Sequence, residues 1–273
     1  FLVGGKLCVL LPGEEKNPKA IIESIERYNI TAIHFVPTML HVFLQYVEAS
    51  QTSNKLKTLL FIFSSGEALQ INQVELCHRI FKETSLQLYN LYGPTEATIE
   101  VTACNCFKTN YNRSVPIGNP ISNVRIYIVD KYNNIQPVGI TGELCIAGDA
   151  LARGYLNKPE LTQKKFEIHP FSKKQNPFYH ENVIYRTGDL AKWRYDGTIE
   201  YIGRSDSQVK IHGYRIELGD IRSNILKHDK ITDAVVIINA KKQICMFFVS
   251  QCKLVPQDLR TFLSQYLPDY MIP

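Results

Sequence analysis

The feature that most constrains the fold is an alternation of short apolar runs with stretches of helical periodicity over the first hundred residues. The runs have the length of strands, and the stretches between them place apolar residues on one helical face. Strand–helix–strand alternation at this spacing predicts βαβ units and a parallel sheet. The expected strands are Ile30–Val36, Leu59–Phe63 and Leu86–Leu91, and the expected helices are Pro18–Arg27, Thr38–Val47 and Ile71–Lys82.

Ligands of parallel sheets bind beyond the carboxyl ends of the strands, so the loops Pro37–Thr38, Ser64–Ala68 and Tyr92–Glu96 are the candidate binding loops. In the last loop, the Thr95 hydroxyl and the Glu96 carboxylate suit a Mg²⁺ ion that carries phosphate oxygens. Tyr92 offers a flat face for a base. The alternative for this loop is a turn with incidental polar groups.

Three other sequence motifs give weaker indications of a binding site. Gly66 would let a flat ligand lie against the backbone, although Ser64–Ala68 taken alone favours a plain strand–helix turn with a serine cap. Asp189, which follows a glycine, could accept hydrogen bonds from both hydroxyls of a ribose. Alternatively, it could lie in an exposed surface turn. Gly203–Asp220 is dense in charge and glycine, which indicates an interdomain hinge or a charged β-hairpin.

The pattern of apolar, turn and charged residues changes at two places along the sequence. From about residue 115, short strands such as Val124–Val129 and Gly142–Ile146 lie between Gly, Asn and Pro turns, a pattern typical of an antiparallel sheet or barrel. From about Gly203 the pattern is that of a small α+β unit. We therefore predict an α/β fold: a parallel βαβ part over 1–110, a distorted antiparallel barrel segment over 111–205 and an α+β subdomain over 206–273. In the last part, helices are expected at Ile221–Leu226 and Gln257–Tyr266 and strands at Ala234–Ile238 and Ile244–Val249.

Composition excludes several classes of protein. The formal net charge is +5 and no run of Lys or Arg forms a patch, which argues against a nucleic-acid partner. The seven cysteines fit no zinc or redox spacing and are interpreted as packing thiols in a reducing cytoplasm. The apolar opening Phe1–Leu11 is predicted to be a buried strand and neither a signal peptide nor a membrane span. The sequence begins without Met, as an excerpt from a longer chain would.

Five strings, taken in order, resemble the adenylate-forming superfamily and, within it, the adenylation domains of nonribosomal peptide synthetases. The resemblance implies that residues 1–205 are the C-terminal part of the AMP-binding core and that 206–273 are an incomplete small C-terminal subdomain. It covers essentially the whole chain. The strings are Asn90–Glu96, Gly142–Leu156, Tyr185–Leu190, Gly203–Asp220 and Leu267–Pro273.

The resemblance implies ligase chemistry with ATP and Mg²⁺: an amino acid becomes an aminoacyl-adenylate and then passes to the phosphopantetheine thiol of a peptidyl carrier protein. By this match, Glu96 would hold Mg²⁺, Thr95 would contact phosphate, Asp206 would be the hinge and Lys210 would serve the thiolation state. The implied nucleotide-binding residues are Gly66, Glu67, Ala68, Asn90, Tyr92, Asp189, Tyr201 and Arg204.

The resemblance also implies an amino-acid pocket with donors and an acceptor among apolar walls. Its similarity to serine-type pockets leads us to expect serine, while a buried Glu100 leaves a basic or hydroxylated substrate open. A satisfied core histidine is the alternative interpretation of His34. The implied lining residues are His34, Phe63, Ser65, Leu91, Ile99 and Glu100.

The family's phosphate loop and its catalytic lysine, which belong before Phe1 and after Pro273, are not in this sequence. The expectation is that the full protein is active, with a condensation domain in the same chain, and that these 273 residues alone are inactive. Two enzyme alternatives are a stand-alone ligase that loads an acid onto a separate carrier and an acyl-CoA synthetase. A third, non-enzymatic alternative is a nucleotide-binding or interaction module. The peptide product, module order and oligomeric state are left open.

Overall fold

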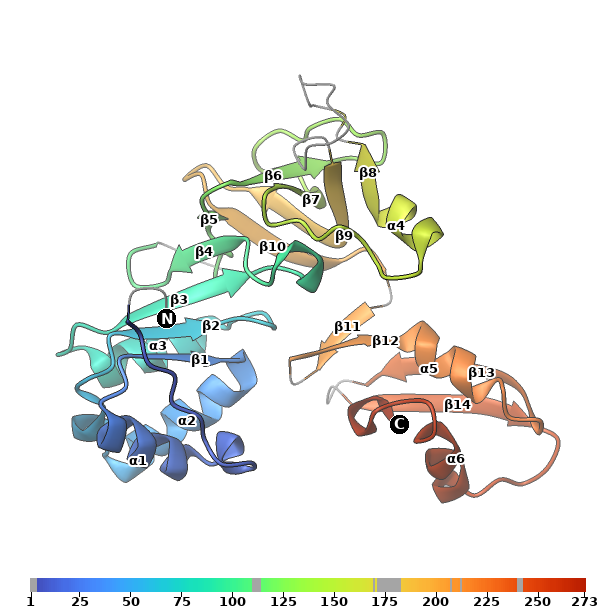
Figure 1. The fold of residues 1–273 in the computed structure, drawn as a ribbon, viewed down its shortest axis with the longest axis horizontal. Coiled ribbons are helices and arrows are strands. Elements are labelled where there is room, and N and C mark those ends of the chain that lie inside the picture. Colours follow the sequence, from blue (N-terminus) through green and yellow to red (C-terminus); the bar gives the residue numbers. More distant parts are fainter. Residues whose placement is uncertain are drawn as a thin grey trace. The chain divides into compact units, whose positions relative to one another are not determined.

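The computed structural model describes residues 4–109, 114–168, 170, 183–206, 208–211, 213–239 and 243–273. The chain divides into two compact units, Phe1–Ser205 and Asp206–Pro273 (Figure 1). Each unit has its own hydrophobic core, so each is described separately.

The first unit begins with a five-stranded sheet in the order β1-β2-β3-β4-β5. Strands β1 to β3 run parallel, and β4 and β5 add antiparallel to the β3 edge. Helices connect the parallel strands, as βαβ units require. The elements are α1 (Pro18–Tyr28), β1 (Ala32–Phe35), α2 (Pro37–Ser50), β2 (Phe61–Ser64), α3 (Ile71–Phe81), β3 (Gln87–Tyr92), β4 (Thr102–Asn105) and β5 (Asn119–Pro120), with short 3-10 turns at Glu14–Lys16, Ser53–Leu56 and Thr95–Ala97.

Local signals in the sequence set the ends of the first helix. Asn17 caps α1 by accepting a hydrogen bond from the Lys19 amide, and Pro18 occupies the first turn, where its missing N–H costs nothing. Asn29 ends the helix in the left-handed conformation. Helices α1, α2 and α3 bury their apolar sides against the same face of the sheet (Figure 1). Each fully buried large apolar side chain contributes about 1.5–3 kcal/mol to this packing.

The second part of the first unit is a curled antiparallel sheet in the order β10-β9-β7-β6, with β8 paired to β9. Alternate residues face a core centred on Ile126, Leu144, Ile146 and Tyr185. This core also contains Tyr92, the last residue of β3, so the end of the first sheet packs against the second. The elements are β6 (Val124–Val129), β7 (Gly142–Gly148), α4 (Pro159–Lys165), β8 (Phe166–Ile168), β9 (Val183–Trp193) and β10 (Ile199–Arg204).

The second unit consists of two antiparallel hairpins and two helices. One face of the β13–β14 hairpin packs against both helices around Ile216, Ile221, Ile225 and Leu263, all fully buried. The elements are β11 (Gln208–Ile211), β12 (Tyr214–Glu217), α5 (Leu218–Ile225), β13 (Ile231–Ile238), β14 (Ile244–Ser250), α6 (Pro256–Leu263) and a 3-10 turn at Asp269–Met271.

The α/β fold class expected from the sequence is confirmed: a parallel sheet with helical connections, a curled antiparallel sheet and an α+β unit. Helix α6 ends at Leu263, earlier than expected, because the chain turns there with Tyr266 N–H bonded to the Leu263 carbonyl. Within the described ranges, no helix is both long and apolar enough to span a bilayer.

Two sequence expectations are wrong. The opening segment is not a buried strand over its described residues, since Leu7 and Val9 are 72% and 78% exposed and pair with no described strand. Apolar residues alone do not make a strand, because a strand needs the backbone hydrogen bonds of a neighbour. The cysteines are all free thiols, but they do not all pack inside, as Cys252 is exposed.

Candidate functional site

The site is built at the carboxyl edge of β1, β2 and β3, where the three loops singled out in the sequence emerge. His34, on β1, and Ser65, just after β2, lie side by side because the two strands are parallel neighbours. His34 Nε2 and Ser65 Oγ are 2.8 Å apart, a hydrogen bond whose direction depends on the tautomer. Partial burial lowers the pKa of His34, which favours the neutral ring.

The loop after β2 is tied to the start of α2. Thr38 Oγ1 donates a hydrogen bond of 2.5 Å to Glu67 Oε2, so the Gly66–Ala68 backbone is held in place. Gly66 has φ +90°, a conformation that favours glycine. Thr38 lies within a loop that the sequence analysis marked, but its hydroxyl was not predicted as an anchor.

The centre of the site is the carboxylate of Asp189, a residue that is only 4% exposed. Tyr92 Oη donates to Asp189 Oδ2 at 2.6 Å, and Arg204 Nη1 donates to Asp189 Oδ1 at 2.8 Å. Burial, together with the charge of Asp189, raises the pKa of Tyr92, so its hydroxyl keeps the proton it donates. Three residues predicted from three separate strings therefore meet in one hydrogen-bonded cluster.

Tyr201 joins this cluster through its ring. It lies on β10, and its ring centroid is 6.2 Å from that of Tyr92. The β9–β10 ladder is irregular between Tyr201 and Gly203, and Arg204 then pairs with Asp189 across the ladder. The two tyrosines and the carboxylate thus share one corner of the first unit, where an aromatic face adjoins a buried negative charge.

Glu96 and Thr95 form the turn that follows β3. The Glu96 side chain is buried, whereas Thr95 is exposed. Tyr155 Oη donates a hydrogen bond of 2.6 Å to Glu96 Oε1. Burial and this hydrogen bond both raise the pKa of Tyr155, so it too stays protonated. The sequence analysis quoted Tyr155 inside the string Gly142–Leu156 but gave it no role.

The segment before Tyr155 docks on the same turn. The Ala152 amide donates to the Glu96 carbonyl at 2.8 Å, and Thr98 Oγ1 donates to the Ala150 carbonyl at 2.6 Å. Gly93 is required where the chain folds back after β3, because a Cβ there would lie 2.1 Å from the Ile99 carbonyl oxygen. Backbone contacts thus fix the place of the Glu96 carboxylate.

The remaining predicted residues lie in different surroundings. The Asn90 amide is buried and donates to the Pro116 carbonyl at 2.9 Å, while Ile99 is 65% exposed. Phe63, on β2, packs against the Tyr89 ring with centroids 5.7 Å apart. Leu91 and Glu100 are both partly exposed.

Asp206 and Lys210 belong to the second unit. Asp206 Oδ1 accepts a hydrogen bond from the Gln208 amide at 3.2 Å, and Lys210 lies on β11.

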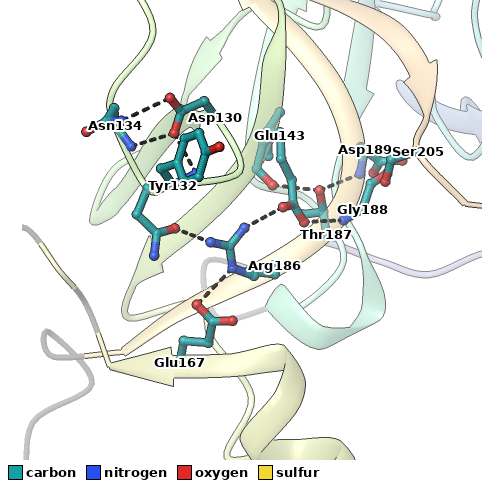
Figure 2. A network of polar contacts seen from close by, with 12 residues as sticks. Asp130, Tyr132, Asn134, Glu143, Glu167, Arg186, Thr187, Gly188, Asp189 and Ser205 are labelled. Atoms are coloured by element: carbon teal, nitrogen blue, oxygen red, sulfur yellow. Dashed lines mark hydrogen bonds and ion pairs between the residues drawn. The ribbon is translucent and has the colours of Figure 1, made fainter.

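A second polar network lies behind Asp189 (Figure 2). The Arg186 guanidinium donates to Glu143, Glu167 and Asn133. Burial by itself lowers the pKa of Arg186, but the hydrogen bond to Glu167 and the nearby carboxylates raise it above its ordinary value, so the group is charged. Sequence reasoning missed Glu143 and Arg186 as well, although both lie in the strings that carried the resemblance.

The donor set around Glu96 fits Mg²⁺ bound together with phosphate. Mg²⁺ takes one or two carboxylates and completes its shell with phosphate oxygens and water. Glu96 supplies one carboxylate and the exposed Thr95 one hydroxyl, and the described residues contain no cluster of three or more His, Cys, Asp or Glu that could hold a metal ion alone. The site therefore suits a metal that arrives with a nucleotide.

Comparison with known proteins identifies the family of the chain. Residues 1–156 match the family model described as "AMP-binding enzyme". This match takes in more than half of the chain, so the protein belongs to the AMP-binding enzyme family. The family resemblance found in the sequence is thereby confirmed.

Curated relatives are peptide and antibiotic synthetases. One component of the mycosubtilin synthase of Bacillus subtilis is 46% identical over 279 residues, which is 100% of this chain and 10% of the relative. Zwittermicin A synthase ZmaJ of Bacillus cereus is 43% identical over 278 residues, which is 100% of this chain and 51% of the relative. The chain thus spans from a tenth to about half the length of these two relatives.

Solved structures share the fold. An adenylation domain, AlmE of Vibrio cholerae, in complex with glycyl-adenosine-5'-phosphate, aligns with a TM-score of 0.78 at 26% identity, covering 97% of this chain and 49% of that chain. NpsA-ThdA of Klebsiella oxytoca, an artificially fused adenylation and PCP di-domain, aligns with a TM-score of 0.76 at 23% identity, covering 98% of this chain and 47% of that chain.

Proposed function

We propose that this chain is the nucleotide-binding part of an amino-acid-activating ligase of nonribosomal peptide synthesis. The observation that carries the proposal is the buried Asp189 carboxylate, held by Tyr92 and Arg204 close to the carboxyl edge of a parallel sheet. Membership of the AMP-binding family and the synthetase relatives support it. In this proposal, the carboxylate of an amino acid attacks the α-phosphorus of ATP, which gives an aminoacyl-adenylate and releases pyrophosphate.

The residues of the cluster have distinct tasks. A carboxylate has about four lone-pair sites, and Tyr92 and Arg204 occupy two at Asp189, which leaves two for the hydroxyls of a ribose. The Tyr201 ring offers a flat surface for stacking on the nucleotide, and Arg204 holds the Asp189 carboxylate through an ion pair. Gly66, Glu67, Ala68 and Asn90 are proposed to shape the adenine side of the site.

Glu96 and Thr95 are proposed to serve the phosphate side. Glu96 would hold Mg²⁺ through the carboxylate that Tyr155 orients, and Thr95 would contact phosphate oxygens. The metal, when bound, neutralises charge that develops on the phosphate groups. Because Glu96 is fixed by the turn after β3, it needs little rearrangement to take a ligand.

The amino-acid side chain is proposed to lie near the His34–Ser65 pair, with Phe63, Leu91, Ile99 and Glu100 around it. A neutral histidine and a hydroxyl can exchange hydrogen bonds with a small polar side chain, so serine is the proposed substrate. In pyrophosphate exchange with the protein at its full natural length, serine should be preferred over threonine, ornithine and alanine. A preference for a bulky apolar amino acid would refute the serine assignment.

Transfer of the acyl group to phosphopantetheine on a peptidyl carrier protein is the proposed second step. Solved structures of the same fold that contain adenylation and PCP domains support such a partner. Asp206, at the start of the second unit, is the proposed hinge, and Lys210 is proposed to act in the transfer state. A condensation domain in the same natural chain and a cytoplasmic location remain predictions.

Binding of AMP to this 273-residue chain tests the central claim. By calorimetry, the wild-type chain should bind AMP, and Asp189→Ala should weaken binding at least tenfold, since a lost hydrogen bond to a charged group is worth roughly 1.5–3 kcal/mol. Glu48→Gln, which changes a surface ion pair with Arg79 on α2 and α3, is the control and should bind normally. Equal binding by Asp189→Ala and the wild type would refute the proposed nucleotide site.

A further inference from the structure

Glu143, on β7, holds the turn from which Asp189 projects. Its Oε1 accepts a hydrogen bond from the Gly188 amide at 3.1 Å, and its Oε2 accepts one from Arg186 Nη1 at 2.5 Å. Figure 2 shows the carboxylate between the guanidinium and the turn. The Glu143 side chain therefore links the Arg186 guanidinium to the Gly188 amide.

The turn needs this support because the sheet is irregular there. Along the β7–β9 ladder, Glu143 pairs with Leu190 and Cys145 pairs with Arg186, so one β7 residue faces three β9 residues. The extra residues of such a bulge lose their regular ladder partners. Two side chains replace them: Glu143 accepts from the Gly188 amide, and Thr187 Oγ1 accepts from the Asp189 amide at 2.9 Å.

The next peptide group, between Gly188 and Asp189, is held as well. Its carbonyl accepts hydrogen bonds from the amide and the hydroxyl of Ser205, each at 2.9 Å. Gly188 has φ +74°, in the left-handed region that favours glycine and permits the turn. Loss of Glu143 would leave the Gly188 amide without its acceptor, so the Thr187–Gly188 peptide group could rotate about the bond from Arg204 to its carbonyl and move Asp189.

Arg186 fixes the Glu143 carboxylate in turn. It also contacts Glu167, on β8, and Asn133, in the β6–β7 connection, and its side chain is 15% exposed. Bonds from two further elements restrict the guanidinium, so the Glu143 carboxylate has one preferred orientation. This polar bridge uses groups that are largely shielded from water, where hydrogen bonds to charges are strong.

We infer that Glu143 is a positioning residue for nucleotide recognition, acting through the Gly188 turn on Asp189. The inference rests on the proposed function, because it assigns Asp189 the role of binding the nucleotide. It adds a residue that makes no contact with the nucleotide itself, and it assigns the ion pair with Arg186 a purpose beyond stabilising the sheet.

The test is a double-mutant cycle in the 273-residue chain, with AMP affinity measured by calorimetry. Glu143→Ala should weaken AMP binding about threefold to tenfold, and Asp189→Ala by tenfold or more. In the Asp189→Ala background, Glu143→Ala should cause little further loss, because a residue that acts through another is not additive with it. Glu143→Gln, which keeps an acceptor for the Gly188 amide, should retain more affinity than Glu143→Ala.

The matched control is Glu200→Ala. Glu200 lies on the same sheet and pairs with Lys192, and its side chain is 19% exposed against 23% for Glu143. Successive strand residues face opposite sides, so Glu200 points away from the face of Tyr201. This variant should lower the melting temperature but leave AMP affinity within about twofold of wild type, because the partners of Glu200 are Lys192 and Ser114 and neither belongs to the Gly188 turn.

The outcomes separate the two claims. If Asp189→Ala weakens binding but Glu143→Ala and Glu143→Gln do not, the positioning role is wrong and the nucleotide site stands. Additive losses in the double variant would also overturn it, since they would mean that Glu143 acts independently of Asp189. If the wild type shows no AMP binding, or Asp189→Ala binds as well as the wild type, both claims fail.

Discussion

Tyr155 donates a 2.6 Å hydrogen bond to Glu96, a residue 59 positions earlier in the chain. The bond joins the turn after β3 to the segment after β7, and the Ala152 amide reinforces it by donating to the Glu96 carbonyl. The Tyr155 ring packs edge-on against Phe166, which limits the positions its hydroxyl can take. The carboxylate proposed to hold Mg²⁺ is thus oriented from outside its own loop.

The first prediction removes this bond with Tyr155→Phe, which keeps the ring and its packing. We expect a loss of about 1–3 kcal/mol in the free energy of unfolding, because the buried Glu96 loses the hydrogen bond from Tyr155. The increase in ATP affinity that Mg²⁺ produces should also fall severalfold. Chemical denaturation and calorimetry with and without Mg²⁺ measure the two effects. Tyr195→Phe, at a tyrosine that is 94% exposed, is the control, and equal behaviour of the two variants would contradict the role of Tyr155.

Much of the fold could be predicted because apolar periodicity is local. The runs that became β1, β2 and β3 alternate with helices of the right length, and their carboxyl ends had to meet at one edge of a parallel sheet. The prediction of a buried strand in the opening segment was wrong because its described apolar residues are exposed and pair with no described strand. Strand pairing depends on tertiary structure, which apolar residues alone do not indicate.

The residues of the candidate site also divide into those that the sequence could predict and those that it could not. Tyr92, Asp189 and Arg204 could be predicted because each lies in a string that resembles a known family. Tyr155 and Glu143 act on a backbone or on another side chain, so their role depends on which segments pack together. A β-bulge such as the one opposite Glu143 leaves no trace in hydrophobic spacing.

The second prediction concerns Gly93. In Gly93→Ala, the new methyl group would meet the Ile99 carbonyl oxygen at 2.1 Å, so the turn after β3 must shift. We expect a loss of about 1–3 kcal/mol of stability and weaker AMP binding, since Tyr92 and Glu96 lie on either side of the glycine. Gly219→Ala, where no atom lies within 4 Å of the added Cβ, is the control and should be neutral or slightly stabilising. Normal stability of Gly93→Ala would show that the turn is not tightly packed.

The third prediction is a pH dependence. Burial lowers the pKa of His34, so the unfolded chain binds this proton more readily than the folded chain. The contribution to stability is complete above the ordinary histidine pKa of about 6.5 and is lost as the pH falls toward the lower folded value. As the pH is lowered from about 7 to about 5, across the ordinary histidine pKa of about 6.5, the melting temperature of His34→Gln should therefore fall less steeply than that of the wild type. Asn72→Ala, at an exposed residue on α3 without an ionisable group, should keep the slope of the wild type, and a steeper slope for His34→Gln would reverse the assigned sign.

The fourth prediction concerns the ion pair between Arg204 and Asp189, whose side chains are 10% and 6% exposed. Arg204→Met keeps much of the side-chain volume but removes the charge that faces Asp189. Breaking a buried pair leaves an uncompensated charge, so we expect a loss of about 3–5 kcal/mol in the free energy of unfolding. The double variant Arg204→Met/Asp189→Asn should recover part of this stability, because no buried charge is left unpaired. AMP binding should not recover, since Asn offers one neutral acceptor oxygen where the proposed ribose contact uses a charged carboxylate with two. Denaturation curves and calorimetry on the wild type, the single variant and the double variant separate the two effects. Recovery of AMP binding in the double variant would show that the Asp189 charge is not needed for the nucleotide.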